Sequence, residues 1–74
     1  MDVQPEIQDK LDSLPTKPGV YLFRDRLEQV IYVGKSVSLR NRVRSYFHAS
    51  AQREAKTREL VAHVEDLDFI VTDS

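Results

Sequence analysis

Five side chains between residues 21 and 46 are of types that can move a proton or stabilise an anion. They are three tyrosines, one lysine and one arginine, namely Tyr21, Tyr32, Lys35, Arg42 and Tyr46. A free tyrosine has a pKa of about 10 and is a poor base at neutral pH, but nearby cations favour its phenolate form. An arginine keeps its charge, and its planar fork donates two parallel hydrogen bonds to a phosphate. These types therefore suit proton transfer beside a phosphate.

Each of these residues also has a purely structural explanation. Tyr21 and Tyr32 could be a stabilising aromatic pair across two strands, which is the commoner case in an arbitrary hairpin. Tyr46 could lie at the edge of a helical core stripe, and Arg42 could extend its apolar stem over the edge of a sheet. The residue types alone do not decide between chemistry and packing.

The order of elements expected along the chain is helix, strand, strand, helix, helix, strand. A helix over 5–13 follows from a proline near its first turn and from Ile7 and Leu11, which lie one helical turn apart. Residues 20–24 and 29–33 are rich in Val, Ile, Tyr and Phe, so they predict two strands of a β-hairpin around a four-residue polar loop.

The register of this hairpin decides which side chains share a face. If Arg24 pairs with Gln29, Tyr21 lies directly opposite Tyr32. The other face is then purely aliphatic and consists of Val20, Leu22, Ile31 and Val33. A slip by one residue would split that set, so the pattern favours this register and predicts that the aliphatic face packs in the core.

Two more helices and one more strand are expected after Gly34. The first helix is capped by Ser36 or Ser38. Its apolar stripe consists of Leu39, Val43, Tyr46 and Phe47. The second helix is expected over 53–65 and the third strand over 68–72.

The basic residues concentrate in the middle of the chain. Residues 35–58 carry seven Lys or Arg against a single acid, whereas 59–74 carry five acids and no Lys or Arg. On the helical wheel Arg40 and Arg44 lie on a solvent-facing flank, while Arg42 lies at the edge of the apolar stripe. A solvated helix face would have the same composition, so the charge alone does not establish nucleic-acid binding.

Composition excludes several classes of protein. The chain has no cysteine, which excludes disulfides and thiolate metal sites and fits a cytoplasmic setting. The first ten residues are acidic and polar, and no apolar run is long enough to span a membrane, so a secretory signal is not expected. A length of 74 residues allows one small domain, which is marginal alone.

Three segments have a recognisable spacing: GVYLF at 19–23, IYVGK at 31–35 and LRNRVRSYF at 39–47. Arg42 follows Tyr32 by ten residues. This pattern resembles the GIY-YIG nuclease family, and the continuation KTRELVAHVEDLDFIVTDS is similar to its UvrC branch. Two tripeptides alone would be weak evidence, but their hairpin spacing and the arginine-rich helix make the resemblance specific.

The resemblance implies an α+β fold in which a small three-stranded antiparallel sheet is flanked by helices. It covers most of the chain and implies one incomplete domain over 1–74, with a leading helix at 1–14 and the motif core at 15–74. The implied activity is metal-dependent hydrolysis of a DNA phosphodiester bond. In the UvrC branch this reaction is the 3′ incision of nucleotide excision repair. The implied partners are DNA and a UvrB–DNA complex, the latter through regions outside this chain, with no membrane and no small-molecule cofactor.

Catalytic positions are implied for Tyr32, Arg42, Tyr21, Lys35 and Tyr46. Tyr32 corresponds to the tyrosine that takes the proton from the attacking water, Tyr21 to one that positions the site, and Arg42 to the arginine that stabilises charge on the phosphate. The motif glycines are Gly19 and Gly34, the second of which leaves room for backbone and phosphate to approach. Further contacts with DNA phosphates are expected from Arg40, Arg44, Lys56 and Arg58.

The family's metal, Mg²⁺ or Mn²⁺, is held by a glutamate in a helix after the third strand. That position is expected beyond Ser74, and none of the acids near this end matches it: Glu65, Asp66, Asp68 and Asp73. We therefore expect no metal ligand within the chain, and little activity from these residues alone. The chain also departs from the family at 36–38, where SVS lacks a second basic residue that is common there.

Two other functions remain open. A GIY-YIG nuclease outside excision repair is disfavoured by LPTKPGVYLF at 14–23, which resembles the UvrC branch. A non-catalytic nucleic-acid-binding module would keep the fold without the metal, and an acidic residue in the next helix would separate it from a nuclease.

Overall fold

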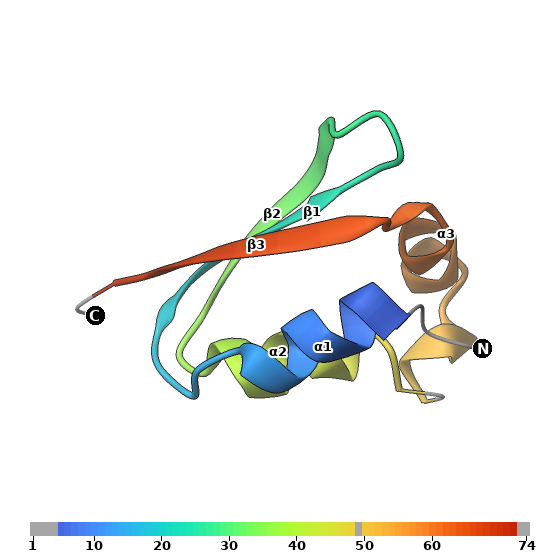
Figure 1. Ribbon diagram of the computed structural model, residues 1–74. Coiled ribbons are helices and arrows are strands. Elements are labelled where there is room, and N and C mark those ends of the chain that lie inside the picture. Colours follow the sequence, from blue (N-terminus) through green and yellow to red (C-terminus); the bar gives the residue numbers. More distant parts are fainter. Residues whose placement is uncertain (1–4, 49, 73–74) are drawn as a thin grey trace.

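The structure, a computed structural model, describes residues 5–48 and 50–72. These residues form a three-stranded sheet with helices packed against it (Figure 1). In chain order the elements are α1 (Pro5–Ser13), β1 (Gly19–Arg24), β2 (Val30–Ser36), α2 (Leu39–Ser45), the 3₁₀ helix η1 (Ala51–Arg53), α3 (Ala55–His63) and β3 (Asp66–Val71). The sheet is antiparallel with the strand order β2-β1-β3. This confirms the expected α+β class, and α1 has the bounds predicted for it; residues 1–4 of the leading segment lie outside the described residues.

Two boundaries near the end of the chain differ from the prediction. The helix expected over 53–65 is shorter, because η1 occupies its start and the backbone is already extended at Val64. The strand expected over 68–72 begins earlier, at Asp66. Its early start has a hydrogen-bonding cause, since the N–H of Glu65 donates to the carbonyl of Arg24 at 2.8 Å and so begins the β1–β3 pairing.

The hairpin register differs from the predicted one by two residues. Tyr21 lies opposite Gly34, and Tyr32 lies opposite Phe23. The prediction that the two tyrosines are directly opposed is therefore wrong. An even shift leaves Tyr32 on its original face, because side chains alternate along a strand, whereas Val30, which now lies opposite Arg24, changes face. The two tyrosines still share a face.

The shift has two local causes. The N–H of Asp25 donates to the carbonyl of Gln29 at 3.0 Å, which leaves a loop one residue shorter than expected. Glu28 has a φ of 63°, the left-handed conformation that often ends a three-residue hairpin loop. Ile31 then has no partner on β1 and forms a β-bulge immediately before Tyr32.

The aromatic face of the sheet forms the core, and not the aliphatic face as predicted. Tyr21 and Phe23 are 1% and 0% exposed, whereas Val33 and Ile70 on the opposite face are 55% and 60% exposed. Figure 1 shows α1 and α2 side by side on one side of the sheet, which is the aromatic side. Aromatic rings bury more apolar area than valines do, so covering this face excludes more surface from water.

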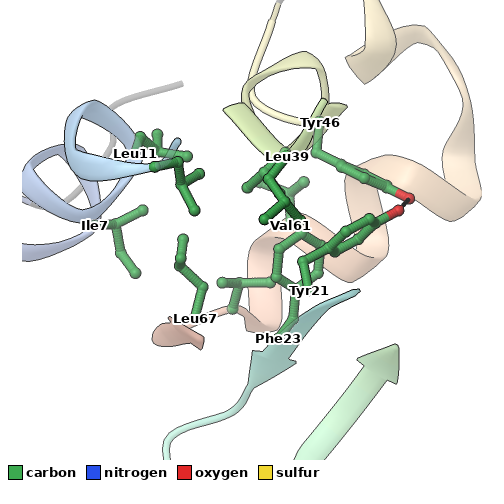
Figure 2. Packing of buried hydrophobic residues seen from close by; sticks show 11 residues of the cluster. Ile7, Leu11, Tyr21, Phe23, Leu39, Tyr46, Val61 and Leu67 are labelled. Carbon is green, nitrogen blue, oxygen red and sulfur yellow. Dashed lines mark hydrogen bonds between the residues drawn. The ribbon is translucent and has the colours of Figure 1, made fainter. Parts of the chain in front are cut away.

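The buried cluster draws on all three α-helices and on two strands (Figure 2). It consists of Ile7, Leu11, Leu14, Tyr21, Phe23, Leu39, Val43, Tyr46, Val61, Val64 and Leu67. Phe47 packs partly buried against it, so the apolar stripe predicted for α2 is confirmed. The sheet and α2 therefore meet through aromatic side chains.

The start of α2 is held by the loop after α1. Ser38 occupies the N-cap position, as predicted, but makes no side-chain cap hydrogen bond. Instead the N–H of Leu39 donates to the carbonyl of Lys17 at 3.0 Å, and the N–H of Arg40 donates to the carbonyl of Pro15 at 3.1 Å. These bonds satisfy donors that a helix start leaves open and fix α2 relative to the chain before β1.

Ion pairs attach α1 and β1 to the third strand. Lys10 on α1 forms a salt bridge with Asp66 at the start of β3. Its hydrogen bond holds the pKa of the Asp66 carboxyl below its usual range. On the outer face, Arg24 Nε donates to an Asp68 carboxylate oxygen at 3.0 Å. Both carboxylates are therefore already engaged with cations.

Candidate active site

Four aromatic rings contact one another where β1 and β2 meet α2. They belong to Tyr21 and Phe23 on β1, Tyr32 on β2 and Tyr46 at the end of α2, and we call them the four-ring cluster. Their centroids lie 5.2 to 6.2 Å apart in all six pairings. Three of the rings were candidate catalytic residues from the sequence, and the fold brings them together.

The hydroxyls of this cluster differ in their access to solvent. Tyr21 and Tyr46 are 1% and 9% exposed, and their oxygens are hydrogen-bonded at 2.9 Å (Figure 2). Tyr32 is 39% exposed. Burial raises the pKa of Tyr46 well above its ordinary value, and hydrogen bonds with Tyr21 and Tyr32 raise it further. Tyr46 therefore stays protonated, while Tyr32 is the phenol that a solvent molecule can reach.

Arg42 brings a positive charge to the same cluster. Its guanidinium carbon lies 5.1 Å from the centre of the Tyr46 ring, and Nη2 lies 3.5 Å from the Tyr46 hydroxyl. Its interaction with the Tyr21 hydroxyl raises the pKa of Arg42, and the proximity of Tyr46 raises it further. This confirms the predicted position of Arg42 at the edge of the stripe, one turn before Tyr46. An exposed, permanently charged fork thus borders the tyrosines.

Both motif glycines are required by close packing. A Cβ on Gly34 would lie 2.4 Å from the Cζ and hydroxyl oxygen of Tyr21. The space above Gly34 is thus filled by this phenol, and not left open to a phosphate as expected from the sequence. At Gly19 a Cβ would lie 2.4 Å from the carbonyl oxygen of Ile70 and 2.7 Å from Leu39 Cδ1. Gly34 therefore seats Tyr21, and Gly19 allows β3 to approach.

Gly34→Ala is expected to destabilise the protein, although an alanine in a strand is ordinarily better than a glycine. The added methyl must displace the buried Tyr21 phenol, which should lower the free energy of unfolding by about 1–3 kcal/mol. Urea denaturation followed by tyrosine fluorescence measures this change. Val33→Ala, at the exposed neighbouring position, is the matched control and should change stability far less. A gain in stability from Gly34→Ala would show that Tyr21 does not depend on this space.

Lys35 is not brought to the tyrosines. It lies opposite Val20, on the face of the sheet away from Tyr32. There it lines a hollow of about 400 Å³ at the end of the sheet with Gly19 and Thr72. The sheet therefore separates Lys35 from the four-ring cluster.

The four expected DNA-binding residues have different environments. Arg40 is half-buried, and its Nε donates to the carbonyl of Leu14 at 2.7 Å, so its predicted solvent-facing position is wrong. Arg44 on α2 is exposed, as predicted, and so are Lys56 and Arg58 on α3. Lys56 lines an apolar groove of about 580 Å³ between α3 and the hairpin. Three of the four are therefore exposed.

The acids near the end of the chain do not suit a divalent cation. In the described ranges 5–48 and 50–72, no three His, Cys, Asp or Glu side chains gather in a group that could hold a metal ion. Asp66 and Asp68 are paired with Lys10 and Arg24. Asp73 lies outside the described residues. No helix of the described part is long and apolar enough to cross a bilayer.

Comparisons with known proteins agree with this geometry. Residues 17–74 match the sequence model of the UvrC-like GIY-YIG domain. UvrABC system protein C of Streptococcus sanguinis is 54% identical over 68 residues, which are 92% of this chain and 11% of that protein. The protein of the same name from Salinibacter ruber is 52% identical over 75 residues, which are 100% of this chain and 12% of that protein. The chain thus spans about a ninth of the length of these relatives.

Solved structures extend the similarity to the fold. The GIY-YIG N-terminal endonuclease domain of UvrC from Thermotoga maritima, bound to its catalytic divalent cation magnesium, superposes with a TM-score of 0.79 at 31% identity. The match covers 95% of this chain and 74% of that domain. Other structures of the Thermotoga domain each carry one tyrosine-to-phenylalanine substitution, at three different tyrosines.

Proposed function

Because the chain belongs to the family of UvrC-like GIY-YIG domains, we propose that it forms the catalytic core of an endonuclease that hydrolyses a DNA phosphodiester bond. One observation carries this proposal. The exposed tyrosine of the four-ring cluster, Tyr32, lies against two buried, hydrogen-bonded phenols, and one of these, Tyr46, contacts an exposed guanidinium. Since its relatives are UvrABC system proteins, we assign it to the 3′ incision of nucleotide excision repair in the cytoplasm, on a UvrB–DNA complex.

Tyr32 is the proton acceptor in this proposal. Its ring packs on the cluster while the residue is 39% exposed, so an attacking water can approach it. Tyr46 stays protonated and can donate a hydrogen bond toward a phenolate. Such a bond stabilises the phenolate that a proton acceptor here needs, its own proton having passed to solvent before the attacking water binds. The fixed Tyr21–Tyr46 pair keeps that donor in place.

Arg42 stabilises the charge that develops on the phosphate. Its guanidinium is exposed and is oriented by the Tyr46 ring and hydroxyl. Preorganised donors of this kind contribute more than mobile ones because they need no rearrangement during reaction. Arg44, Lys56 and Arg58 add less specific attraction for the DNA backbone.

The divalent cation is assigned to a ligand outside these 74 residues. Magnesium is the catalytic cation of the Thermotoga domain, but the described acids of this chain form no site for it. We infer that a glutamate in a following helix would hold Mg²⁺ or Mn²⁺ for this site. When bound, such an ion supplies Lewis acidity at the phosphate.

A comparison of two chains tests the proposal. One is residues 1–74 alone, and the other, the hybrid chain, joins residues 1–74 to the C-terminal part of the Thermotoga domain that lies beyond the match. The hybrid chain should nick supercoiled plasmid in the presence of Mg²⁺. Residues 1–74 alone should be slower by at least about 100-fold, because a charge-stabilising group is missing.

The controls separate the competing functions. Chelation of Mg²⁺ should stop the hybrid chain, and fluorescence anisotropy should report DNA binding by both chains. A folded hybrid chain that binds DNA without cutting it would favour the non-catalytic binding module. If residues 1–74 alone cut DNA as fast as the hybrid chain in the presence of magnesium, the inference that the metal ligand lies outside these residues would be wrong. A GIY-YIG nuclease outside excision repair is disfavoured by the match to the UvrC-like domain over 17–74.

A further inference from the structure

We propose that Phe23 is a positioning residue of this site, whose ring holds the phenols of Tyr32 and Tyr46 in the arrangement that the reaction needs. The inference rests on the proposed function and adds to it a residue that has no reactive group. Phe23 is the one member of the four-ring cluster without a hydroxyl, and it is 0% exposed.

The contacts of Phe23 reach all three tyrosines. Its ring lies 6.1 Å from that of Tyr32 at an interplanar angle of 29°, and these two residues are paired across β1 and β2. It meets the Tyr46 ring at 5.2 Å and 89°, the edge-to-face arrangement that aromatic pairs prefer. The Tyr21 ring lies 5.6 Å away. One side chain thus limits the tilt of three phenols.

The phenols of Tyr32 and Tyr46 depend on this support because of their positions in the fold. Tyr32 is on β2, an edge strand of the described sheet, directly after the bulge at Ile31. Tyr46 is the C-cap of α2, where a helix has already lost part of its hydrogen bonding. Phe23, by contrast, lies on the central strand between β2 and β3. The most rigid element therefore carries the ring against which the two less restrained rings are packed.

The type of residue at this position also fits a positioning function. A tyrosine here would bury a fourth hydroxyl at a fully enclosed position, which is costly without a partner. A leucine would fill part of the volume but offers no flat face or edge to the neighbouring rings. Phenylalanine supplies the surfaces without adding a group that competes for the hydrogen bonds of Tyr21 and Tyr46.

The composition of the chain provides a direct spectroscopic readout of this arrangement. The chain has three tyrosines and no tryptophan, and all three tyrosines belong to the four-ring cluster. The tyrosine band of the near-ultraviolet circular dichroism spectrum therefore reports how these rings are fixed, without interference from elsewhere in the chain.

Phe23→Leu tests the inference, with Phe47→Leu as the matched control. Phe47 is partly buried and contacts Phe23 at 6.4 Å, so the same substitution there removes a ring next to the cluster but outside it. In the hybrid chain, Phe23→Leu should lower kcat for nicking by about 10- to 100-fold, the effect of a misplaced reacting group, with KM unchanged. In residues 1–74 it should remove most of the tyrosine band while the far-ultraviolet spectrum is kept. Phe47→Leu should change neither.

A second pair of variants separates positioning from loss of stability. Leu67→Ala removes a buried side chain on the other side of Phe23 and should destabilise the fold with little loss of kcat. Phe23→Met keeps the apolar volume, and replaces Phe23→Leu in every measurement if the leucine variant unfolds. It should retain an intermediate kcat. Phe23 variants that lose no more kcat than Leu67→Ala, or that keep the tyrosine band, would overturn the inference.

Failure of the proposed function has a different signature. If the hybrid chain with the natural Phe23 does not nick DNA at all, the nuclease assignment fails whatever Phe23 does. If it nicks DNA and the Phe23 variants nick it equally well, the nuclease assignment stands and the positioning function fails.

Discussion

Tyr32→Phe should abolish nicking by the hybrid chain while the fold stays intact. The substitution removes the hydroxyl of the most exposed tyrosine in the four-ring cluster and keeps the ring that packs against Tyr21 and Phe23. General-base catalysis is worth about 10²–10⁴-fold in rate, so the nicking rate should fall by that factor. A plasmid-nicking time course in Mg²⁺ measures the loss, and urea denaturation checks that stability is unchanged.

The matched comparison for this variant is Tyr21→Phe. It also removes one hydroxyl and keeps the ring, but the hydroxyl is buried and its partner is Tyr46. Tyr21→Phe should therefore lower stability more than Tyr32→Phe does, since water can replace a lost hydrogen bond at the more exposed Tyr32. Cleavage by Tyr32→Phe close to that of the natural residue would remove Tyr32 as the base.

Arg42→Ala is the second variant with a large expected effect. Loss of an electrostatic group at the reacting phosphate costs about 10²–10³-fold in rate. Arg44→Ala, on the same helix and exposed, should weaken DNA binding slightly and leave the rate of the bound complex nearly unchanged. Single-turnover nicking at saturating protein separates these two effects because it measures the bound complex alone.

Two further substitutions sharpen the comparison. Arg42→Lys keeps the charge but loses the planar fork, so it should recover only part of the rate. Arg40→Ala removes the hydrogen bond to the Leu14 carbonyl, so it should act on stability instead of on cleavage. Equal rate losses at positions 40, 42 and 44 would mean that α2 offers only diffuse positive charge.

Much of the fold follows from periodicity in the sequence. The spacing of Ile7 and Leu11 gave α1 its observed bounds, and the stripe from Leu39 to Tyr46 identified the buried face of α2. The side-chain alternation in the hairpin also placed Tyr21 and Tyr32 on one face correctly. These features are local, so they can be worked out from neighbouring residues alone.

The features that the sequence did not reveal depend on contacts between distant segments. The two-residue shift in register needs both the left-handed Glu28 and the bulge at Ile31. The loop has no Asn-Gly or Asp-Gly dipeptide from which either feature could be predicted. The aliphatic set looked like a core because nothing in the strands shows which face the helices will cover. Arg40 looked solvent-facing because its partner, the Leu14 carbonyl, lies far away in the sequence.

Phe23 was also missed as part of the site. Its signal was present, since it follows Tyr21 by two residues and must share its face. Phenylalanine has no group for proton transfer or charge stabilisation, so its residue type alone does not indicate a place in a reactive site. The structure shows that the candidate reactive tyrosines gather around that inert ring.

The first helix shows that the limits of the family's sequence model and the limits of the folding unit differ in this small domain. The match to the family begins at residue 17, yet Ile7, Leu11 and Leu14 are only 2%, 3% and 0% exposed, and Lys10 is paired with Asp66. These are three of the eleven side chains in the buried cluster. An expression boundary chosen from the family alignment would therefore cut through the cooperative unit, and the recombinant product would expose the surface that α1 now covers.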